Sequence, residues 1–239
     1  MSISTLKYLG ESVGPLFDAA AWHKFAEVVS GLMRETLPTE LLEPLVDNNI
    51  KFSVPLCIDK CVIQVNLILA CREVFQACAD VPLDPMQQLL NSLQVAYEFA
   101  RNFNRDHERR NQLWAGGFLS NTKTLPGLFR LENEALKCLL TLLFYFHKSE
   151  KSVQAPLYAL CKQVLAEQLQ RDEVSPERQQ ELDNLMPVVS ELVLPEVEQD
   201  LETALQYMGS ELVGLVVSED LGVRQQLKTI LLATLSLVK

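Results

Sequence analysis

The sequence predicts an all-α protein built as an armadillo- or HEAT-like stack of helical hairpins, an α-solenoid of about nine or ten helices. Apolar residues recur at spacings of three and four along most of the 239 residues. Strand-type alternation is nearly absent, and Leu, Gln, Glu and Ala, which favour helices, dominate. Helix pairs recur about every 40 residues, as in such arrays. Because no strict sequence period accompanies this spacing, a compact all-helical bundle is the alternative.

The N-terminal part is expected to contain four helical segments, over residues 3–14, 19–35, 40–46 and 55–79. The second has the clearest pattern, with an inward face that includes Trp22 and Phe25. Asp18 is a suitable N-cap for it, because its carboxylate can accept a hydrogen bond from the first turn.

The middle of the chain is expected to contain a helix over residues 85–104, a short charged helix and a helix over residues 128–148. Asp84 and Pro85 predict the start of the first, as N-cap and first helical residue. The charged helix is expected to end at Gly116–Gly117, and residues 119–127 read as a loop. The helix over 128–148 is apolar over most of its surface, which favours a central position. Its acids Glu132 and Glu134 are expected at exposed positions.

The C-terminal third is expected to contain helices over residues 153–171, 176–186 and 196–217, and a last helix after Ser218. Ser152 and Ser175 are the predicted caps of the first two, and Pro187 is expected to bend or end the second. Residues 1–239 are expected to form a single elongated helical-repeat domain. The apolar last helix makes a homodimer a further expectation.

The charge is unevenly distributed. The net charge is −10, and residues 171–220 contain thirteen acids and two bases, or −11, which leaves +1 for the rest. An acidic segment argues against binding to nucleic acid or to anionic lipid. A basic partner surface is one interpretation, and a solvated face that keeps the protein soluble is the other. The candidate partner residues are Glu196, Glu198, Asp200 and Glu202.

No catalytic, cofactor-binding or metal-binding residue is expected. The four cysteines at positions 57, 61, 71 and 78 are spread over more than ~30 Å of helix, too far apart to bind one ion. The three histidines have no partner at a spacing that suggests a triad, and no phosphate-binding glycine loop is present. An all-helical enzyme is therefore the least favoured alternative. No run reaches the ~18 uninterrupted apolar residues of a membrane span, so no transmembrane segment is expected.

Residues 98–118 are the most distinctive stretch. An apolar helix face with Phe99 and Phe103 passes into a charged run, and the stretch ends on Leu113, a glycine pair and Phe118. Two helices are expected to meet here, held together by the buried aromatic residues Phe103, Trp114 and Phe118.

This stretch resembles one near the C-terminal end of the large brefeldin-A-inhibited guanine nucleotide exchange factors for Arf GTPases. The resemblance continues more weakly upstream, at residues 21–23, 34–38 and 58–64, and downstream at Pro126, Leu128 and Glu132. Gly116, Gly127 and Leu131 depart from the family pattern. The matching positions are Phe99, Ala100, Phe103, Asn104, Glu108, Arg110, Leu113, Trp114, Gly117 and Phe118.

The resemblance implies a non-catalytic regulatory or scaffolding segment, because in that family a separate domain performs exchange and nothing in this chain matches it. The segment would belong to a larger protein that is cytoplasmic and peripheral on the trans-Golgi network or endosomes. Its implied partners are an Arf-type GTPase, other domains of the same exchange factor, or Golgi recruitment factors. A helical-repeat scaffold of a related Golgi trafficking protein without exchange activity is the alternative.

A concentrated basic group offers a second candidate partner surface. It consists of Arg101, Arg105 and Arg109, next to Arg110, and arginine is favoured at protein interfaces. The alternative is that these side chains pair locally with Asp106 and Glu108 along the helix.

Overall fold

The computed structural model describes residues 8, 12, 14–45, 50–77, 81–119, 126–147, 153–170, 176–192, 206–211 and 213. Within these residues every regular element is helical and none is a strand, so the predicted all-α stack of helices is confirmed. The chain divides into two compact units, Met1–Leu139 and Leu140–Lys239.

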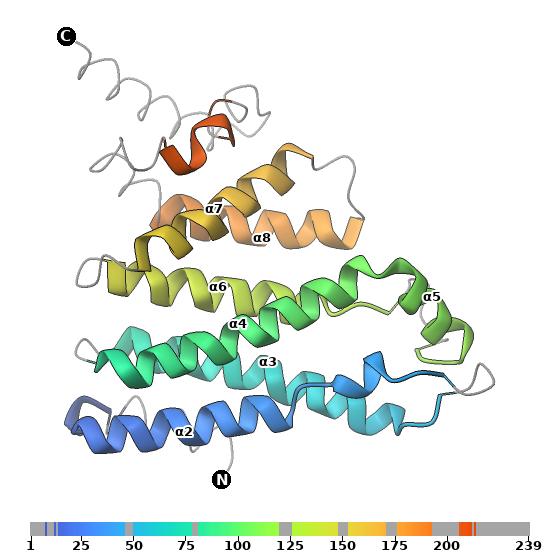
Figure 1. Ribbon diagram of the computed structural model, residues 1–239, viewed down its shortest axis with the longest axis horizontal. Coiled ribbons are helices and arrows are strands. Elements are labelled where there is room, and N and C mark those ends of the chain that lie inside the picture. Colours follow the sequence, from blue (N-terminus) through green and yellow to red (C-terminus); the bar gives the residue numbers. More distant parts are fainter. Residues whose placement is uncertain are drawn as a thin grey trace. The chain divides into compact units, whose positions relative to one another are not determined.

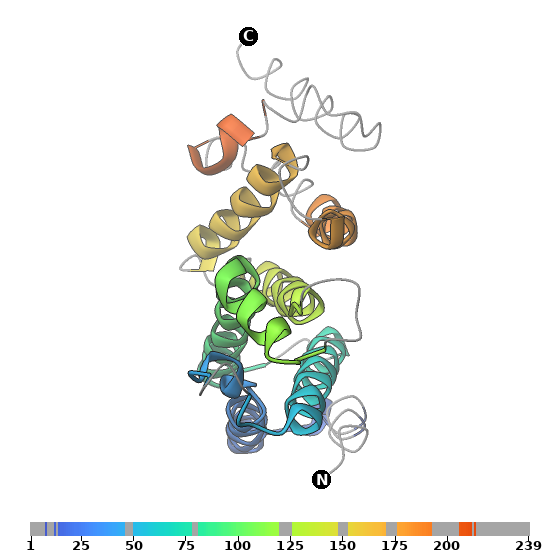
Figure 2. The same ribbon diagram turned by 90° about the vertical axis from the view of Figure 1, so that its right-hand side faces the viewer.

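The first unit contains the helices that pack most closely (Figure 1). In this unit α2 packs against both α3 and α4, and Figure 2 shows the same three helices turned by 90°. Its elements are the 3-10 turns η1 (Gly14–Leu16) and η2 (Thr39–Leu42), the helices α2 (Ala19–Glu35), α3 (Val54–Ala77), α4 (Leu83–Arg105) and α5 (His107–Ala115), and the first residues of α6 (Phe129–His147).

Helix α2 has the predicted bounds and the predicted cap. The Ala21 backbone N–H donates to Asp18 Oδ1 (2.8 Å) and so satisfies one donor of the first turn. Its apolar face is buried around Trp22, whose ring stacks on Phe75 of α3 with centroids 5.8 Å apart. This aromatic contact joins α2 to α3.

Helix α4 begins two residues before the predicted start. The helix starts at Leu83 with Pro82 in the N-cap position, where no side chain accepts a hydrogen bond. Asp84 therefore lies in the first turn, and Pro85 is buried inside that turn. Proline is tolerated there because the first-turn amides have no intrahelical acceptor. The predicted cap at Asp84 was wrong for this reason.

Helix α6 confirms the apolar pattern but contradicts the expected exposure of its acids. Leu131, Ala135 and Cys138 are buried as expected. Glu132 is buried as well, and Glu134 is half-buried beside Arg72 of α3, with its Oε2 3.1 Å from Arg72 Nη1. The charge of each carboxylate suggested exposure, but a polar partner from another segment makes burial possible.

The described part of the second unit consists mainly of the last residues of α6 and of the helices α7 (Gln154–Leu169) and α8 (Pro176–Leu192). Helices α7 and α8 pack against each other. Arg178 of α8 donates from Nε to Glu167 Oε2 of α7 at 3.0 Å. Tyr158 stacks on Tyr207, with centroids 5.9 Å apart. Helix α8 continues through Pro187 to Leu192, so of the two predicted effects of Pro187, a bend or an end, the end was wrong.

Other predicted elements differ from the structure or lie partly or wholly outside the described residues. The turn predicted over 40–46 is the shorter η2, and the N-cap of α7 is Val153 without a side-chain hydrogen bond. The loop at 119–127 is described at its two ends only, and of the helices predicted over 3–14 and 196–217 only short helical pieces are described. Other predictions concern residues outside those described: the caps Ser152 and Ser175, the last helix, and the acids Glu196, Glu198, Asp200 and Glu202.

Candidate protein-interaction surface

The distinctive stretch forms a buried polar network where α4, α5 and α6 meet. Asn104, at the end of α4, donates from Nδ2 to Glu132 Oε2 of α6 at 2.7 Å. Its Oδ1 accepts from the Leu128 backbone N–H at 2.6 Å. Because both side-chain atoms of the amide are used, Asn104 fixes the entry to α6 relative to α4.

Arg110 of α5 completes this network. Its side chain is 4% exposed and donates from Nε to the Pro126 carbonyl oxygen (2.7 Å) and from Nη1 to the Asn104 carbonyl oxygen (2.9 Å). The guanidinium also lies over the Phe129 ring, 5.1 Å from its centroid. Two backbone segments are thus held by one planar group, a task for which arginine is well suited.

The end of α5 is a Schellman motif. Phe118 N–H donates to the Leu113 carbonyl (2.9 Å) and Gly117 N–H to the Trp114 carbonyl (3.1 Å). Gly117 has φ +97°, a left-handed conformation that strongly favours glycine. Leu113 and Phe118 are buried, as this motif commonly requires, and the Phe118 ring lies 6.1 Å from that of Phe52. The glycine pair therefore ends α5 where the sequence predicted.

Trp114 does not hold the helices together, contrary to expectation, because its side chain is 42% exposed. Helix α5 has nine residues, and Arg110 and Leu113 are the ones it buries. A short surface helix covers the core with one side, so a neighbouring aromatic residue can remain at the edge. Phe103 and Phe118 are buried as predicted, Phe99 is half-buried and Glu108 is exposed.

The three arginines of the basic group lie in different environments. Arg109 donates from Nε to the Leu41 carbonyl oxygen (2.7 Å) and from its guanidinium to the Glu43 carbonyl, which joins α5 to the segment around η2. Burial lowers the pKa of Arg109. Arg101 lies over the Tyr97 ring, 5.8 Å from its centroid, and Arg105 is exposed. Arg105 is therefore the exposed member of this group, whereas Arg101 and Arg109 are half-buried.

The cysteines are mostly buried in helices. Burial raises the pKa of the Cys138 thiol to about 12, and it also raises the pKa of Cys71 and Cys161. On α3 a hydrogen bond between Cys57 and Cys61 lowers the pKa of Cys61 and raises that of Cys57. Among the described residues, no three His, Cys, Asp or Glu side chains come together in a group that could hold a metal ion.

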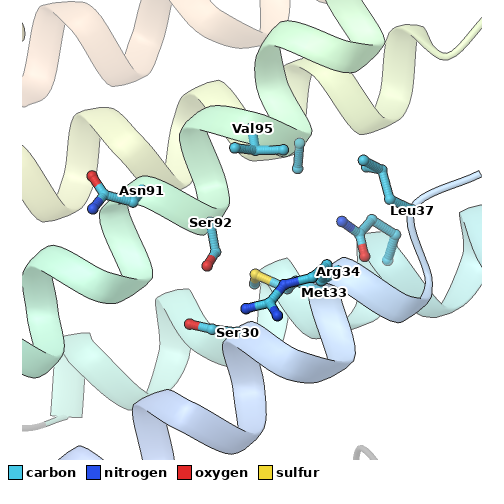
Figure 3. Close-up of a pocket in the computed structure, with 9 residues that line it drawn as sticks. Ser30, Met33, Arg34, Leu37, Asn91, Ser92 and Val95 are labelled. Atoms are coloured by element: carbon cyan, nitrogen blue, oxygen red, sulfur yellow. The ribbon is translucent and has the colours of Figure 1, made fainter. Parts of the chain in front are cut away.

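A groove between α2 and α4, with α3 beside it, is the candidate contact site that sequence reasoning missed (Figure 3). It has a volume of about 210 Å³, and its wall includes Ser30, which is 2% exposed, and Gln64, which is 1% exposed. Neither Ser30 Oγ nor Gln64 Nε2 has a hydrogen-bond partner within the described part of the chain. A buried polar atom without a partner costs about 1–3 kcal/mol, so these two atoms mark the groove as unusual.

Helix α3 is, among the described helices, the one long and apolar enough to cross a membrane by length and composition. Over Val54–Gln76 its mean hydropathy is 1.7, and 39% of its most apolar window is buried. Core helices of soluble proteins pass the same test. Lys60 pairs with Glu40 and Arg72 with Glu134, as expected of a helix packed against other segments. The absence of a membrane span stays a prediction.

The fold and these contacts define an all-α protein whose distinctive residues join helices to one another. Residues 62–232 match the family described as "BIG2 C-terminal domain", which covers more than half of the chain. The chain therefore belongs to this family. No solved structure matches it.

Curated relatives are similar over shorter stretches. The chain is 37% identical over 68 residues to human "Brefeldin A-inhibited guanine nucleotide-exchange protein 1", covering 28% of this chain and 4% of that protein. For the mouse protein the identity is 33% over 85 residues, covering 33% and 4%. For yeast "ADP-ribosylation factor guanine nucleotide-exchange factor SEC7" it is 28% over 137 residues, covering 54% and 6%.

These matches confirm the resemblance to a region of the large Arf exchange factors. The chain spans only 4–6% of the length of these relatives.

Proposed function

We propose that this chain is a non-catalytic regulatory and scaffolding segment of a large Arf guanine nucleotide exchange factor. The observation that carries the proposal is the family match over residues 62–232. It is supported by the family-motif residues Asn104, Arg110 and Gly117, which make internal structural contacts rather than a reactive cluster. A stack of helices offers side-chain surfaces to which other proteins can bind.

The proposed setting is Golgi and endosomal vesicle traffic, at the cytoplasmic surface of these membranes. The relatives are named for guanine nucleotide exchange. The proposed partners are an Arf-type GTPase, other domains of the same exchange factor, or Golgi recruitment factors, and a second copy of the chain is a further candidate. Residues 1–239 would act together as one helical-repeat segment of the larger polypeptide.

An exchange assay tests the non-catalytic role. The purified chain is expected to leave the rate of fluorescent GDP release from an Arf GTPase unchanged, whereas the full-length exchange factor accelerates it. Removal of this segment from the full-length factor is expected to change its recruitment to Golgi membranes or its exchange rate. Acceleration by the chain alone, or an unaltered truncated factor, would contradict the proposal. A natural polypeptide without an exchange domain would also contradict it.

The basic surface is proposed to contribute through Arg105 and, beside it, Arg101 and Arg109. Arg109 is a poor probe, because its side chain also binds the Leu41 carbonyl oxygen. Arg105→Glu is the better change because Arg105 is the exposed member of the group, with Arg130→Glu on exposed α6 surface as the matched control. A charge at the edge of an interface mainly affects association rate. Arg105→Glu should therefore slow partner association at low salt more than at high salt, measured by surface plasmon resonance, and equal effects of both variants would remove Arg105 from the surface.

A further inference from the structure

The groove between α2 and α4 is of a size that suits one or two side chains of a partner. Its volume is about 210 Å³. Sites for cofactors and drug-sized molecules usually occupy roughly 300–1,000 Å³, whereas a cavity of about 150 Å³ already accepts benzene. A short piece of a protein is therefore a better occupant than a nucleotide or a cofactor.

The orientation of Gln64 makes its free atom a donor. Thr36 Oγ1 lies 2.7 Å from Gln64 Oε1 and 2.7 Å from the Leu32 carbonyl oxygen, but a hydroxyl has one hydrogen to donate. Because Oε1 is the Gln64 atom that faces the hydroxyl, it is the acceptor of that contact, and the Nε2 hydrogens remain for an acceptor in the groove.

The other polar groups of the groove also favour an anion. Figure 3 shows Ser30 and Arg34 of α2 and Ser92 of α4 extending into the space between these helices. Arg34 is exposed and supplies a positive charge, and the buried Ser30 hydroxyl can donate a second hydrogen bond. Ser92 donates to the Gln88 carbonyl oxygen at 3.1 Å, so its own hydrogen is already used. The nine lining residues include no Asp or Glu.

The charge count distinguishes a carboxylate from a phosphate. A phosphate group carries about −1.5 to −2 charges and is usually bound by clusters of arginines. This groove combines one arginine with neutral donors, which suits a single negative charge. Of the remaining wall, Asn91 is polar and its Oδ1 accepts from Gln87 Nε2 at 3.2 Å. The rest is apolar and is formed by Met33, Leu37, Val95 and Ala96.

We propose that the groove between α2 and α4 binds an acidic peptide segment of a partner protein through one carboxylate and an adjacent aliphatic side chain. The carboxylate accepts hydrogen bonds from Arg34, Ser30 and Gln64. The aliphatic side chain packs against Leu37 and Val95. This inference deepens the proposed function, because it states the chemistry of a partner, but it concerns binding alone and does not require exchange activity in any assay.

A fragment titration of the whole chain tests the proposal directly. The probe is 4-methylpentanoate, which joins one carboxylate to a leucine-like side chain, and the matched neutral probe is 4-methylpentanamide. Two-dimensional NMR should show saturable shifts of the Gln64 side-chain amide and of the α2 backbone amides with the carboxylate. The amide should bind about tenfold more weakly or worse, because it lacks the charge-assisted hydrogen bonds.

Three variants separate the groove from the rest of the surface. Arg34→Gln should abolish or weaken carboxylate binding by about tenfold, since the positive charge is lost. Ser30→Ala should weaken it by a smaller factor, and Arg130→Gln, on an exposed part of α6, should leave it unchanged. Arg34 is exposed, so its variant should fold normally, as circular dichroism can verify.

Peptide display on the same protein tests the partner class. Peptides selected on the wild-type chain, after removal of those that also bind Arg34→Gln, should be enriched in Asp or Glu next to Leu, Ile or Val. Inorganic phosphate that binds more tightly than 4-methylpentanoate would overturn the assignment to a carboxylate. Equal binding of both fragments would overturn it as well, because binding would then not depend on the charge. No shift with either fragment, together with no selected acidic motif, would show that the groove binds no such ligand. Each of these results would leave the exchange-factor assignment intact, because that depends on separate assays.

Discussion

Arg110 is a polar residue whose loss should destabilise the first unit. Its guanidinium lies in a buried position and donates to the carbonyl oxygens of Pro126 and Asn104. Arg110→Leu would remove both donors and leave these acceptors without them. We expect the free energy of unfolding to fall by about 2–4 kcal/mol, measured by urea denaturation monitored by circular dichroism.

Arg130→Leu is the matched control for this change, because Arg130 is exposed and belongs to α6, the helix that also provides Glu132. Exposed substitutions usually change stability by less than about 0.5 kcal/mol. If Arg110→Leu were as mild as Arg130→Leu, the network around Asn104 would contribute little to stability.

The pair Cys57 and Cys61 predicts selective thiol reactivity. The hydrogen bond with Cys57 lowers the pKa of Cys61, so more of this half-exposed thiol is ionised near neutral pH. Burial raises the pKa of Cys138 to about 12, which keeps that thiol protonated. In the folded protein at pH 7.5, iodoacetamide should therefore modify Cys61 well before Cys138, as mass spectrometry of the digested protein would show.

The effect of pH on the same thiol follows from the direction of the shift. Cys57→Ala removes the hydrogen bond, so the pKa of Cys61 should rise and its alkylation at pH 7.5 should slow. The difference in the alkylation rate of Cys61 should vanish at a pH well above its pKa in both proteins, because the thiolate then predominates with or without the hydrogen bond. Cys57→Ser retains a hydroxyl donor and serves as the control. If Cys61 were alkylated as fast in Cys57→Ala as in Cys57→Ser, the hydrogen bond would not be the cause of the lowered pKa.

At the scale of the element, the end of α5 depends on the backbone of Gly117. A methyl group at Gly117 meets no atom within 4 Å, so only the φ of +97° opposes a side chain. Gly117→Ala should therefore cost about 1–2 kcal/mol. Gly31, inside α2, also has open space around it, and its φ is not in the left-handed region.

Gly31→Ala should instead stabilise the protein by about 0.5–1 kcal/mol, because alanine favours the helix. Thermal unfolding of the two variants compares them directly. Opposite shifts are expected, and shifts of the same sign would show that φ is not the cause at Gly117.

The elements that were predicted best are those with local signals. Asp18 fixes the start of α2 and the glycine pair fixes the end of α5, because caps and left-handed residues act within one turn. The start of α4 was misplaced because Asp84 and Pro85 fit a first turn as well as a cap. The exposed Trp114 and buried Glu132 could not be predicted, since their environments depend on distant segments.

At the scale of the whole molecule, the net charge of −10 predicts weak affinity for other polyanions. Nucleic-acid binding requires lysines and arginines that neutralise phosphates. The chain should therefore pass through a DNA column at physiological salt without retention, and gel-shift titrations should show no complex. A salt-dependent complex of micromolar affinity or tighter would contradict this expectation.

The sequence predicted the fold class and the family, but it could not predict the candidate groove. Ser30, Gln64 and Val95 are far apart in the chain and come from three helices. Periodicity indicates which face of each helix is inward, but it does not indicate where two inward faces fail to fill the space between them. The hydrogen bonds of Asn104 and Arg110 could not be predicted for a similar reason, because their acceptors lie in other segments.

The way in which α5 and α6 are fixed also has a practical use. Phe118 is held on one side by the Leu113 carbonyl, and Pro126 and Leu128 are held on the other by Arg110 and Asn104. Residues 120–125, part of the loop that the sequence predicted, connect these two attachments along the chain. Lengthening a loop between fixed ends costs little entropy, so an epitope tag or a dye-carrying insert placed there should report on the native protein in living cells.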